Sequence, residues 1–394
     1  MESRKLRGGM VGGGIGSFIG PVHRMAATMD GQAEFVAGVF SSDPKKSKQC
    51  GKEFYLNPSR VYGDYKEMVQ KEAALPPGER LDFVSITTPN RYHFDMAKMF
   101  LEAGFNVICD KPMTYNLAEA KALKAIVVKS GRVFALTHNY IGYPMVKQAR
   151  YMVRQGLLGK INKVVVEYPQ GWLARLLDSW EDVTSIWRLN PKIAGASATM
   201  ADIGTHAENL GRYITGLEID ELCADLSCFI PANCLDDDGN VLIHYKGGAR
   251  GVLCASQIST GEENGLNIRV YGSKLSLYWN QENPNYLVAK SKGGYKTTYS
   301  KGNAILSNED KNNDMLCDEA KNASRLPFGH TEGFIEAFAN IYLEAFKGMR
   351  AELAGQPIPI CDHSTADDGV IGMAFIETVV ASAASDKKWT KMLQ

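Results

Sequence analysis

Apolar and polar positions follow two different patterns along this chain of 394 residues. In the first third, short and almost wholly apolar runs alternate with segments of helical periodicity, as in parallel strands that are covered on both faces. The predicted strands are residues 6–11, 35–40, 82–87, 106–109 and 133–137, and the predicted helices are 21–29, 64–73, 91–103 and 117–130. This alternation predicts an α/β domain with a doubly wound parallel sheet over residues 1–142.

Beyond a predicted helix at 144–154, the pattern changes to longer extended runs separated by turn-forming residues. These runs are 162–170, 222–229, 241–245, 249–258, 266–271, 275–279 and 285–289. Sequences such as DDDGN at 236–240 mark the turns, further helices are predicted at 201–215, 332–347 and 367–382, and 300–330 is predicted to be loop. Short turns between strands predict a second, α+β domain over residues 143–394 with a large, mostly antiparallel sheet.

The charge balance and the cysteine pattern exclude several classes of function. Lys+Arg and Asp+Glu both number 44, so no basic excess indicates binding to nucleic acid or to an anionic membrane. The polar N-terminus has no signal-peptide pattern, and no apolar run approaches the ~18 residues of a transmembrane helix. The eight cysteines are scattered without a C-x-x-C pair, so we expect no disulfide framework and no metal site. These features predict a cytoplasmic protein with reduced cysteines.

The segment MVGGGIGSFIG at 10–20 follows the first predicted strand and precedes the first predicted helix. In that setting glycines let the backbone turn tightly beside a pyrophosphate, and the helix N-terminus offers free N–H groups to the phosphates. Two registers fit: Gly12-x-Gly14-x-x-Ser17, or a longer loop in which Gly20 is the third glycine and Pro21 begins the helix. We predict a Rossmann dinucleotide site, with a turn that binds no ligand as the alternative. The residues expected at the cofactor are Gly12, Gly14, Ser17, Phe18 and Ile19.

The end of the second predicted strand bears on which dinucleotide binds, because an Asp or Glu there bonds the 2′-hydroxyl of NAD. Here the sequence is VFSSDPKK, which places Ser41 and Ser42 at that position with Lys46 close by. Serine with a nearby lysine is also compatible with the 2′-phosphate of NADP. These residues therefore leave the choice between NAD and NADP open; we predict NAD, with NADP as the alternative.

A lysine directly follows the fourth predicted strand, in the sequence VICDKPMT at 107–114. Ligands of open α/β sheets bind at the carboxyl ends of the strands, so Lys111 is expected at the cofactor crevice. The alternative is a structural ion pair with Asp110. In DIGTHAEN at 202–209, Asp202 and His206 stand four residues apart and share one face of the predicted helix. A histidine there can take the proton of an alcohol.

These segments, together with TTPNRYHFDMAKMFLEAGFNVICDKPMT at 87–114 and WRLNP at 187–191, resemble the Gfo/Idh/MocA oxidoreductases over nearly the whole chain. The resemblance implies an N-terminal Rossmann domain and a C-terminal domain whose large sheet forms homodimers or homotetramers. It also implies NAD- or NADP-dependent chemistry on one secondary hydroxyl of a sugar, inositol or related polyol. This sequence departs from the family pattern at two places. The glycine loop is longer, and Asp110 stands where most members have Glu.

The resemblance also implies roles for single residues. His206 would be the main general base, Asp202 would orient the substrate or the imidazole, and Lys111 would bond the reacting hydroxyl and assist proton transfer. The residues implied to line the cofactor are Thr88, Pro89, Asn90, His93, Asp110, Lys111, Trp187 and Arg188.

Three further segments carry candidate substrate-binding residues. Asn139, Tyr140 and Tyr143 follow the fifth strand and can bond sugar hydroxyls, with a packed hinge as the alternative. Gln170 and Trp172 follow another strand, where an aromatic ring can stack on the face of a sugar. His330 precedes a helix, and it is expected either to reach the substrate or to cap that helix.

The sequence thus predicts an oxidoreductase that transfers a hydride between a secondary alcohol of a sugar, glycoside or cyclitol and a nicotinamide. One alternative is an NAD-dependent glycosidase that oxidises the sugar transiently and eliminates the aglycone. Another is a non-catalytic NAD(P)-binding sensor, which would need the glycine loop but neither Lys111 nor His206.

Overall fold

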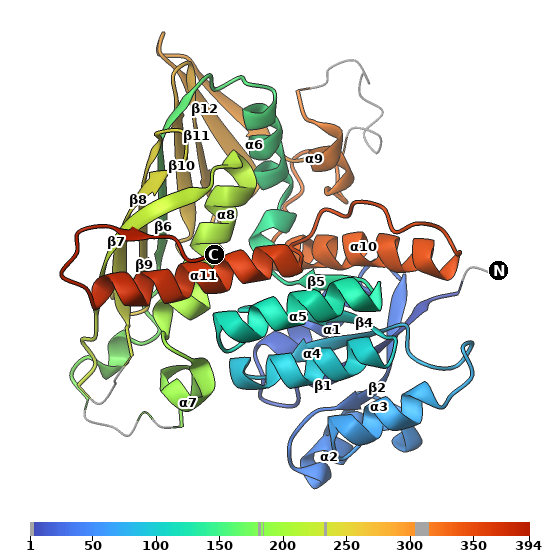
Figure 1. Ribbon diagram of the computed structural model, residues 1–394. Helices are drawn as coiled ribbons and strands as arrows, with labels where there is room; N and C mark the ends of the chain where they lie inside the picture. Colours follow the sequence, from blue (N-terminus) through green and yellow to red (C-terminus); the bar gives the residue numbers. More distant parts are fainter. Residues whose placement is uncertain (1–3, 180–182, 184, 232–234, 304–314) are drawn as a thin grey trace. The chain divides into compact units, whose positions relative to one another are not determined.

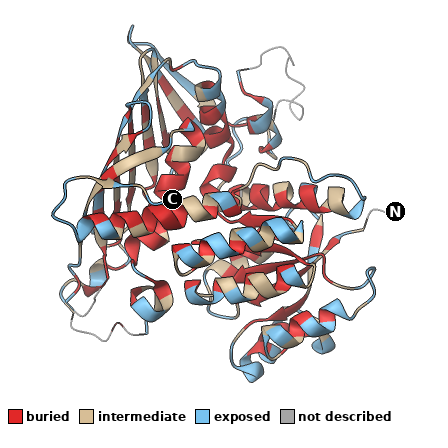
Figure 2. Cartoon of the chain, viewed as in Figure 1, coloured by how far each residue is buried: buried red, intermediate tan, exposed pale blue. Residues whose placement is uncertain are grey.

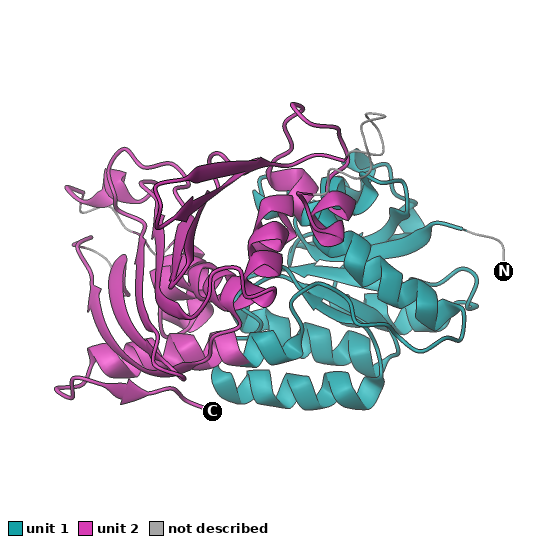
Figure 3. Cartoon of the chain, turned by 90° about the horizontal axis from the view of Figure 1, so that it is seen from above, with its two compact units in different colours: residues 1–138, 338–370 teal, residues 139–337, 371–394 magenta. Residues whose placement is uncertain are grey.

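The computed structural model describes residues 4–179, 183, 185–231, 235–303 and 315–394. The chain divides into two compact units (Figure 3): unit 1 contains residues 1–138 and 338–370, and unit 2 contains residues 139–337 and 371–394. The first break lies close to the predicted boundary at 142. The return of residues 338–370 to unit 1 was not predicted.

Unit 1 is built on a five-stranded parallel sheet in the order β2-β1-β3-β4-β5 (Figure 1). Its strands are β1 (Leu6–Gly12), β2 (Ala33–Val39), β3 (Phe83–Thr87), β4 (Asn106–Cys109) and β5 (Phe134–Leu136). Every residue of β3, β4 and β5 is buried, which explains why these runs lack polar alternation (Figure 2). The predicted doubly wound sheet is confirmed.

The helices of unit 1 begin and end at residues suited to those positions. They are α1 (Ile19–Thr28), α2 (Pro44–Glu53), α3 (Tyr65–Ala73), α4 (His93–Glu102) and α5 (Leu117–Ser130), together with parts of α10 (Phe334–Leu353) and α11 (Ala366–Ala383). The carboxylates of Asp43 and Asp64 accept backbone N–H groups at the starts of α2 and α3. Helix α2 was not predicted because its sequence, PKKSKQCGKE, has almost no apolar stripe.

An aromatic stripe on α10 explains why residues 338–370 join unit 1. Phe338, Tyr342 and Phe346 recur every four residues and therefore share one face of the helix. The rings of Tyr342 and Phe346 lie 6.3 Å and 5.2 Å from that of Phe83 in β3. The Tyr342 hydroxyl is 2.7 Å from His23 Nδ1 and 2.8 Å from Ser85 Oγ, so a buried polar chain links α1, α10 and β3.

Unit 2 contains a nine-stranded sheet in the order β13-β12-β11-β10-β6-β9-β8-β7-β14. The strands are β6 (Ile161–Pro169), β7 (Ile219–Ser227), β8 (Asp238–Tyr245), β9 (Arg250–Ser256), β10 (Asn267–Gly272), β11 (Leu275–Asn280), β12 (Tyr286–Ser291), β13 (Lys296–Ser300) and β14 (Thr390–Lys391). Strands β6 and β9 pair in parallel and the other neighbours pair antiparallel. The predicted large, mostly antiparallel sheet is confirmed.

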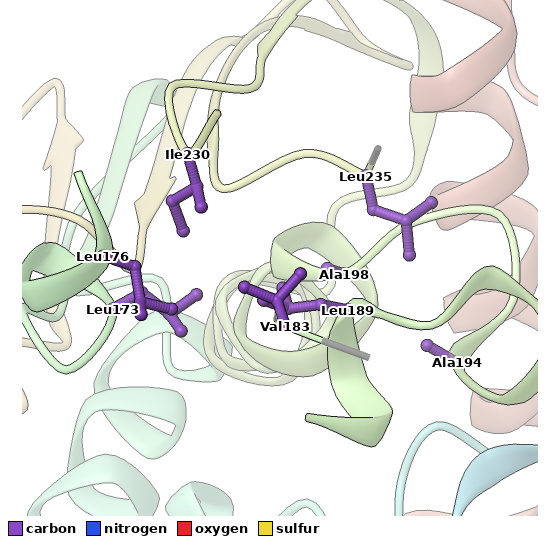
Figure 4. Close-up of a cluster of buried hydrophobic side chains, with 8 residues drawn as sticks. All are labelled: Leu173, Leu176, Val183, Leu189, Ala194, Ala198, Ile230 and Leu235. Carbon is purple, nitrogen blue, oxygen red and sulfur yellow. The ribbon is translucent and has the colours of Figure 1, made fainter. Parts of the chain in front are cut away.

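The helices of unit 2 are α6 (Pro144–Arg154), α7 (Pro191–Ala194), α8 (Thr205–Thr215) and α9 (Asp318–Asn322), together with the first residues of α10 and most of α11. A π-helical turn (Met200–Gly204) leads directly into α8. The long segment between β6 and this turn packs with Ile230 and Leu235, which follow β7, in a small apolar core (Figure 4). Its buried members are Leu173, Leu176, Val183, Leu189, Ala194, Ala198, Ile230 and Leu235. This core holds the segment that carries Trp187 and Arg188.

Within the described residues, we looked for membrane-spanning helices, metal-binding groups and disulfide bonds. None of the described helices is both long and apolar enough to cross a membrane. Within the same residues, no group of three His, Cys, Asp or Glu is arranged to hold a metal ion. The seven described cysteines form no disulfide bond with one another. Cys234 lies outside the described residues, as do residues 304–314 of the predicted loop.

Buried His23 is expected to make the folded protein sensitive to mild acid. Burial lowers the pKa of His23 from 6.5 to about 4. Between these values the unfolded chain binds more protons than the folded chain, so the free energy of unfolding falls as the pH falls. We expect this one group to remove about 3 kcal/mol of stability between about pH 6.5 and about pH 4.

His23→Phe keeps an aromatic ring beside Phe338 and removes the titrating group. Urea unfolding at about pH 7.5 and about pH 5 should show a smaller loss of stability in this variant than in the wild type. His330→Gln, a change at an exposed histidine, serves as the control. The same loss in wild type and His23→Phe would contradict the prediction.

Candidate active site

The glycine loop joins β1 to α1 through contacts that leave no room for a side chain at Gly14 or Gly20. A Cβ at Gly14 would lie 2.4 Å from the carbonyl oxygen of Phe40, at the end of β2. A Cβ at Gly20 would lie 2.3 Å from the carbonyl oxygen of Gly13. Helix α1 begins at Ile19, and the Gly20 N–H donates to Ser17 Oγ at 3.2 Å. Gly20 therefore makes the close helix-to-loop contact, as in the longer register, although Pro21 is not the first helical residue.

This loop fits a dinucleotide. Gly12 and Gly13 have φ angles of 87° and 66°, so the chain turns sharply beyond β1 and the N-terminus of α1 follows the loop. Two large apolar side chains on the loop remain open to solvent, Ile15 at 55% and Phe18 at 75% exposure. Exposed apolar groups beside bare backbone are suited to contact a ligand that has both phosphates and flat rings.

At the end of β2, hydroxyl groups occupy the position expected to read the ribose. Ser41 Oγ accepts the N–H of Asp43 at 3.1 Å. The Asp43 carboxylate accepts the N–H groups of Lys45 and Lys46 and thereby caps α2. Ser42 and Lys46 are exposed. Asp43, the acidic residue in this stretch, is thus the N-cap of α2.

Lys111 is held by a short polar network at the end of β4. Asp110 Oδ1 accepts the backbone N–H of Lys111 at 2.9 Å and the hydroxyl of Thr137 at 3.0 Å. The Lys111 side chain is half-buried, and its peptide bond to Pro112 is cis. Thr137 comes from the end of β5 and was not predicted, because one threonine after a strand has no distinguishing sequence signal. Asp110 therefore fixes the backbone that carries the lysine.

The segment after β3 contacts the segment after β4 that carries Lys111. Thr88 and Pro89 are half-buried and Asn90 is buried, in a 3-10 turn (Asn90–Tyr92) that leads into α4. His93, the first residue of α4, is fully buried. Its Nδ1 lies 2.9 Å from the carbonyl oxygen of Pro112 and its Nε2 lies 2.7 Å from that of Thr88. The ring nitrogens of His93 therefore face protein carbonyls.

In unit 2, Asp202 lies in the π-helical turn and His206 in the first turn of α8. Turns of this rare kind often occur at functional sites. Asp202 Oδ2 accepts Gln257 Nε2 at 2.8 Å and pairs with Arg188 Nε at 3.2 Å. The Arg188 guanidinium lies 4.5 Å from the centre of the Trp187 ring. The structure thus brings the predicted residues Asp202, Arg188 and Trp187 together, and it adds Gln257.

His206 is 7% exposed and packs against aromatic rings. The Tyr140 ring lies 4.8 Å away, edge to face, and the Tyr168 ring lies 6.4 Å away. The two tyrosine hydroxyls bond each other, and Tyr168 donates to Asn264 Oδ1 at 2.7 Å. Burial raises the pKa of both tyrosines, so they stay neutral beside the imidazole.

Gln170 belongs to the same cluster, since its Nε2 donates to Asn264 Oδ1 at 2.9 Å. Sequence reasoning identified Tyr140, Gln170 and His206 but missed Tyr168 and Asn264. Tyr168 occupies an inward position of a predicted strand, and Asn264 lies in the turn-like sequence GEENGL. A polar residue in a turn gives the same signal whether it is exposed or holds buried hydroxyls.

Asp236 fixes the start of the π-helical turn that carries Asp202. Its carboxylate accepts Ser197 Oγ at 2.9 Å and the N–H groups of Ala198 and Met200 at 2.8 Å and 2.9 Å. Burial raises the pKa of Asp236, whereas these hydrogen bonds lower it. The prediction of a turn at 236–240 was wrong: Asp236 and Asp237 are buried, and β8 begins at Asp238. Both carboxylates are accommodated because backbone N–H groups surround them.

The other candidate substrate-binding residues lie in different settings. Asn139 and Tyr143 are buried, and the Tyr143 ring lies 5.3 Å from that of Trp279. Trp172 is 40% exposed. His330 is exposed, with its Nδ1 3.2 Å from the carbonyl oxygen of Phe328. Among the candidates, hydrogen bonds and ring contacts therefore place Tyr140 and Gln170 in the cluster around His206. Tyr143 adjoins this cluster, because its ring stacks on that of Tyr140 at 6.4 Å.

Two family models match this chain. The one described as "Oxidoreductase family, NAD-binding Rossmann fold" matches residues 6–138. The one described as "GFO/IDH/MocA C-terminal domain" matches residues 146–278. The first match includes the glycine loop and Lys111, and the second includes Asp202 and His206.

Individual proteins are similar over nearly the same length. An uncharacterized oxidoreductase of Bacillus subtilis, YfiI, is 34% identical over 99% of this chain and 97% of its own. A levoglucosan dehydrogenase of Pseudarthrobacter phenanthrenivorans is 26% identical over 75% of this chain and 80% of its own. The crystal structure of an inositol dehydrogenase homologue from Azotobacter vinelandii in complex with NAD⁺ is 32% identical, has a TM-score of 0.91, and matches 99% of this chain and 98% of its own.

Proposed function

This chain belongs to the Gfo/Idh/MocA family of oxidoreductases, with an NAD-binding Rossmann domain, and on that premise we propose that it transfers a hydride between NAD and a secondary alcohol of a sugar or cyclitol. The observation that carries the proposal is the arrangement of Asp202 and His206 on successive turns, with Asp202 held by Arg188 and Gln257. A sensor would need the glycine loop alone. The levoglucosan dehydrogenase and the inositol dehydrogenase homologue support the class of substrate.

The proposed chemistry divides between cofactor and protein. When bound, the nicotinamide accepts or supplies the hydride. The glycine loop would hold the phosphates through backbone N–H groups. His206 takes the proton of the reacting hydroxyl as general base, and Asp202 supplies negative charge one turn away when the imidazole becomes cationic. In the role that we propose for it, Lys111 would donate a hydrogen bond to the reacting hydroxyl and so favour loss of its proton. In keto-sugar reduction, His206 returns the proton.

NAD is the proposed cofactor, with NADP as the competing choice. The NAD⁺ complex of the Azotobacter vinelandii homologue supports NAD. The hydroxyls of Ser41 and Ser42 and the nearby Lys46 leave room for a 2′-phosphate, because no carboxylate other than the helix-capping Asp43 is present in the stretch 40–46.

The experiment that tests this function follows NADH and NADPH formation by the purified protein on a panel of inositols, monosaccharides and glycosides. We expect turnover with a small set of related polyols and a preference for NAD. Release of an aglycone without net NADH would instead support a glycosidase that oxidises its substrate transiently. Binding of NAD without turnover or aglycone release across the panel would support the sensor and contradict the proposal.

The uncovered face of the large sheet supports the further proposal that copies of this chain associate there. Directly paired positions share a face of a sheet. One such row crosses seven strands, and all its members are partly or fully exposed: Cys223, Leu242, Val252, Val165, Arg269, Tyr278 and Val288. A mainly apolar row at the surface is suited to contact its equivalent in a second copy.

Leu242→Lys places a charge in this row at a side chain that is 49% exposed, so the fold should tolerate it. We expect the wild type to be a dimer or tetramer by sedimentation velocity and the variant to dissociate to smaller species. Leu353→Lys, at a leucine of unit 1 that is 38% exposed, should keep the wild-type mass. A monomeric wild type would contradict the proposal.

A further inference from the structure

His93 connects two backbone segments of unit 1 that follow neighbouring parallel strands. Its Nε2 faces the carbonyl oxygen of Thr88, just after β3, at 2.7 Å. Its Nδ1 faces the carbonyl oxygen of Pro112, three residues after β4, at 2.9 Å. The ring is fully buried, so water does not compete for these contacts. The imidazole therefore bridges the segment at 88–90 and the peptide that carries Lys111.

Both contacts are hydrogen bonds only in one protonation state. A carbonyl oxygen can accept but cannot donate, and a neutral imidazole has a single N–H. With both nitrogens protonated, the ring donates to both oxygens. With one proton, a nitrogen lone pair faces an oxygen lone pair, and one side of the bridge must loosen. The bridge is therefore complete only in the imidazolium form.

The surroundings of the ring decide when that form exists. Burial is the largest influence and lowers the pKa of His93 below its ordinary value of 6.5. The charge of Asp110 and the hydrogen bonds to the two carbonyls raise the pKa of His93, whereas the charge of Lys111 lowers it further. Asp110 and Lys111 both lie on the segment after β4. The second hydrogen bond should therefore form as the pH falls below about 6.5 and be lost as the pH rises.

We propose that His93 is a positioning residue, which ties the segment at 88–90 to the Lys111–Pro112 peptide and holds it most firmly when the ring carries two protons. This inference rests on the proposed function, because Lys111 has its role there. Displacement of the segment at 88–90, as by a bound dinucleotide, would be transmitted to Lys111 through the ring. The hydrogen bonds of His93 are thus predicted to couple cofactor binding to the placement of the lysine.

Two variants distinguish the effect of the His93 hydrogen bonds from the effect of the volume that its ring fills. His93→Phe keeps an aromatic ring and removes both donor nitrogens, whereas His93→Gln keeps one donor nitrogen. We expect kcat to fall by up to about 100-fold in His93→Phe and less in His93→Gln, because a small displacement of Lys111 is enough to slow the reaction. His23→Phe is the matched control, since His23 is equally buried in unit 1 but bonds Tyr342. It should keep the wild-type kcat.

The decisive readout does not require a known substrate. In full-length protein with ¹⁵N-labelled histidine, the His93 ring signals are assigned by their loss in His93→Phe and followed from about pH 8 downward while the protein stays folded. We expect one proton-bearing nitrogen at high pH and two at low pH, with NADH affinity falling in His93→Phe relative to wild type as the pH falls. One proton-bearing nitrogen throughout, or equal NADH affinity at every pH, would overturn the proposal. Failure of the proposed function would be seen separately, as the absence of turnover across the substrate panel.

Discussion

His206→Asn is expected to lower kcat by about 10² to 10⁴-fold, the usual contribution of a general base, while NADH binds as tightly as to the wild type. Asparagine keeps a polar side chain of similar reach but cannot accept the hydroxyl proton. The imidazole packs against Tyr140, and Asn264 fixes the tyrosines, so the surrounding structure should persist. The measurement is kcat with the substrate found in the panel, together with NADH fluorescence titration.

His244→Gln is the matched control for this result. His244 lies on β8 in the same unit and pairs with Glu221, away from the cluster around His206. Its replacement should leave kcat within a few-fold of wild type. If His206→Asn kept more than about a tenth of the wild-type kcat, another residue would have to be the general base.

Lys111→Met should produce the second large effect, a loss of kcat of about 10² to 10⁴-fold. Methionine has a similar length and removes the ammonium, so the hydrogen bond to the reacting oxygen is lost. The backbone should keep its place, because Asp110 accepts the N–H of residue 111 and the Thr137 hydroxyl in either protein. Lys111→Arg keeps the charge in a bulkier, planar group, and we expect it to restore only part of the activity.

A structural ion pair with Asp110 would give a different result. In that case Lys111→Met would lower the free energy of unfolding and leave kcat per folded molecule nearly unchanged. Thermal unfolding and active-fraction measurements on the same samples distinguish the two. Lys124→Met removes a partly exposed lysine that pairs with Asp367 in unit 1, so it controls for the loss of one positive charge. It should behave as the wild type in both measurements.

Local chemistry made the main elements of both sheets predictable. Short, mostly apolar runs correctly indicated β1 to β5, and Asn116 and Gly131 correctly indicated the ends of α5. Such signals depend on residues near one another in the chain, so they can be read without knowing the fold. The same reasoning failed for α2, where the helix is set by a capping carboxylate and a few buried positions within a polar sequence.

The residues of the candidate site also fall into two groups, those that local sequence signals indicated and those that only the folded structure revealed. The sequence proposed Lys111, Asp202 and His206, because their types and their places after a strand or on a helix are visible locally. It did not identify Asn264, Gln257 or Thr137, whose hydrogen bonds join residues far apart in the chain. Nor did it show that Asp236 holds the turn that carries Asp202, since a run of aspartates is typical of an exposed turn.

By itself, the sequence determined that this protein has a glycine loop after a buried strand, a lysine at the end of another, and a histidine one helical turn after a carboxylate. These follow from short-range periodicity and from the geometry of single elements. The tertiary structure decided which surfaces meet: α10 packs on Phe83, and His23 bonds Tyr342 across 319 positions of the chain. It also decided that His93 faces two carbonyls. Periodicity shows which face of an element is apolar, but only the folded chain supplies the partner that covers it.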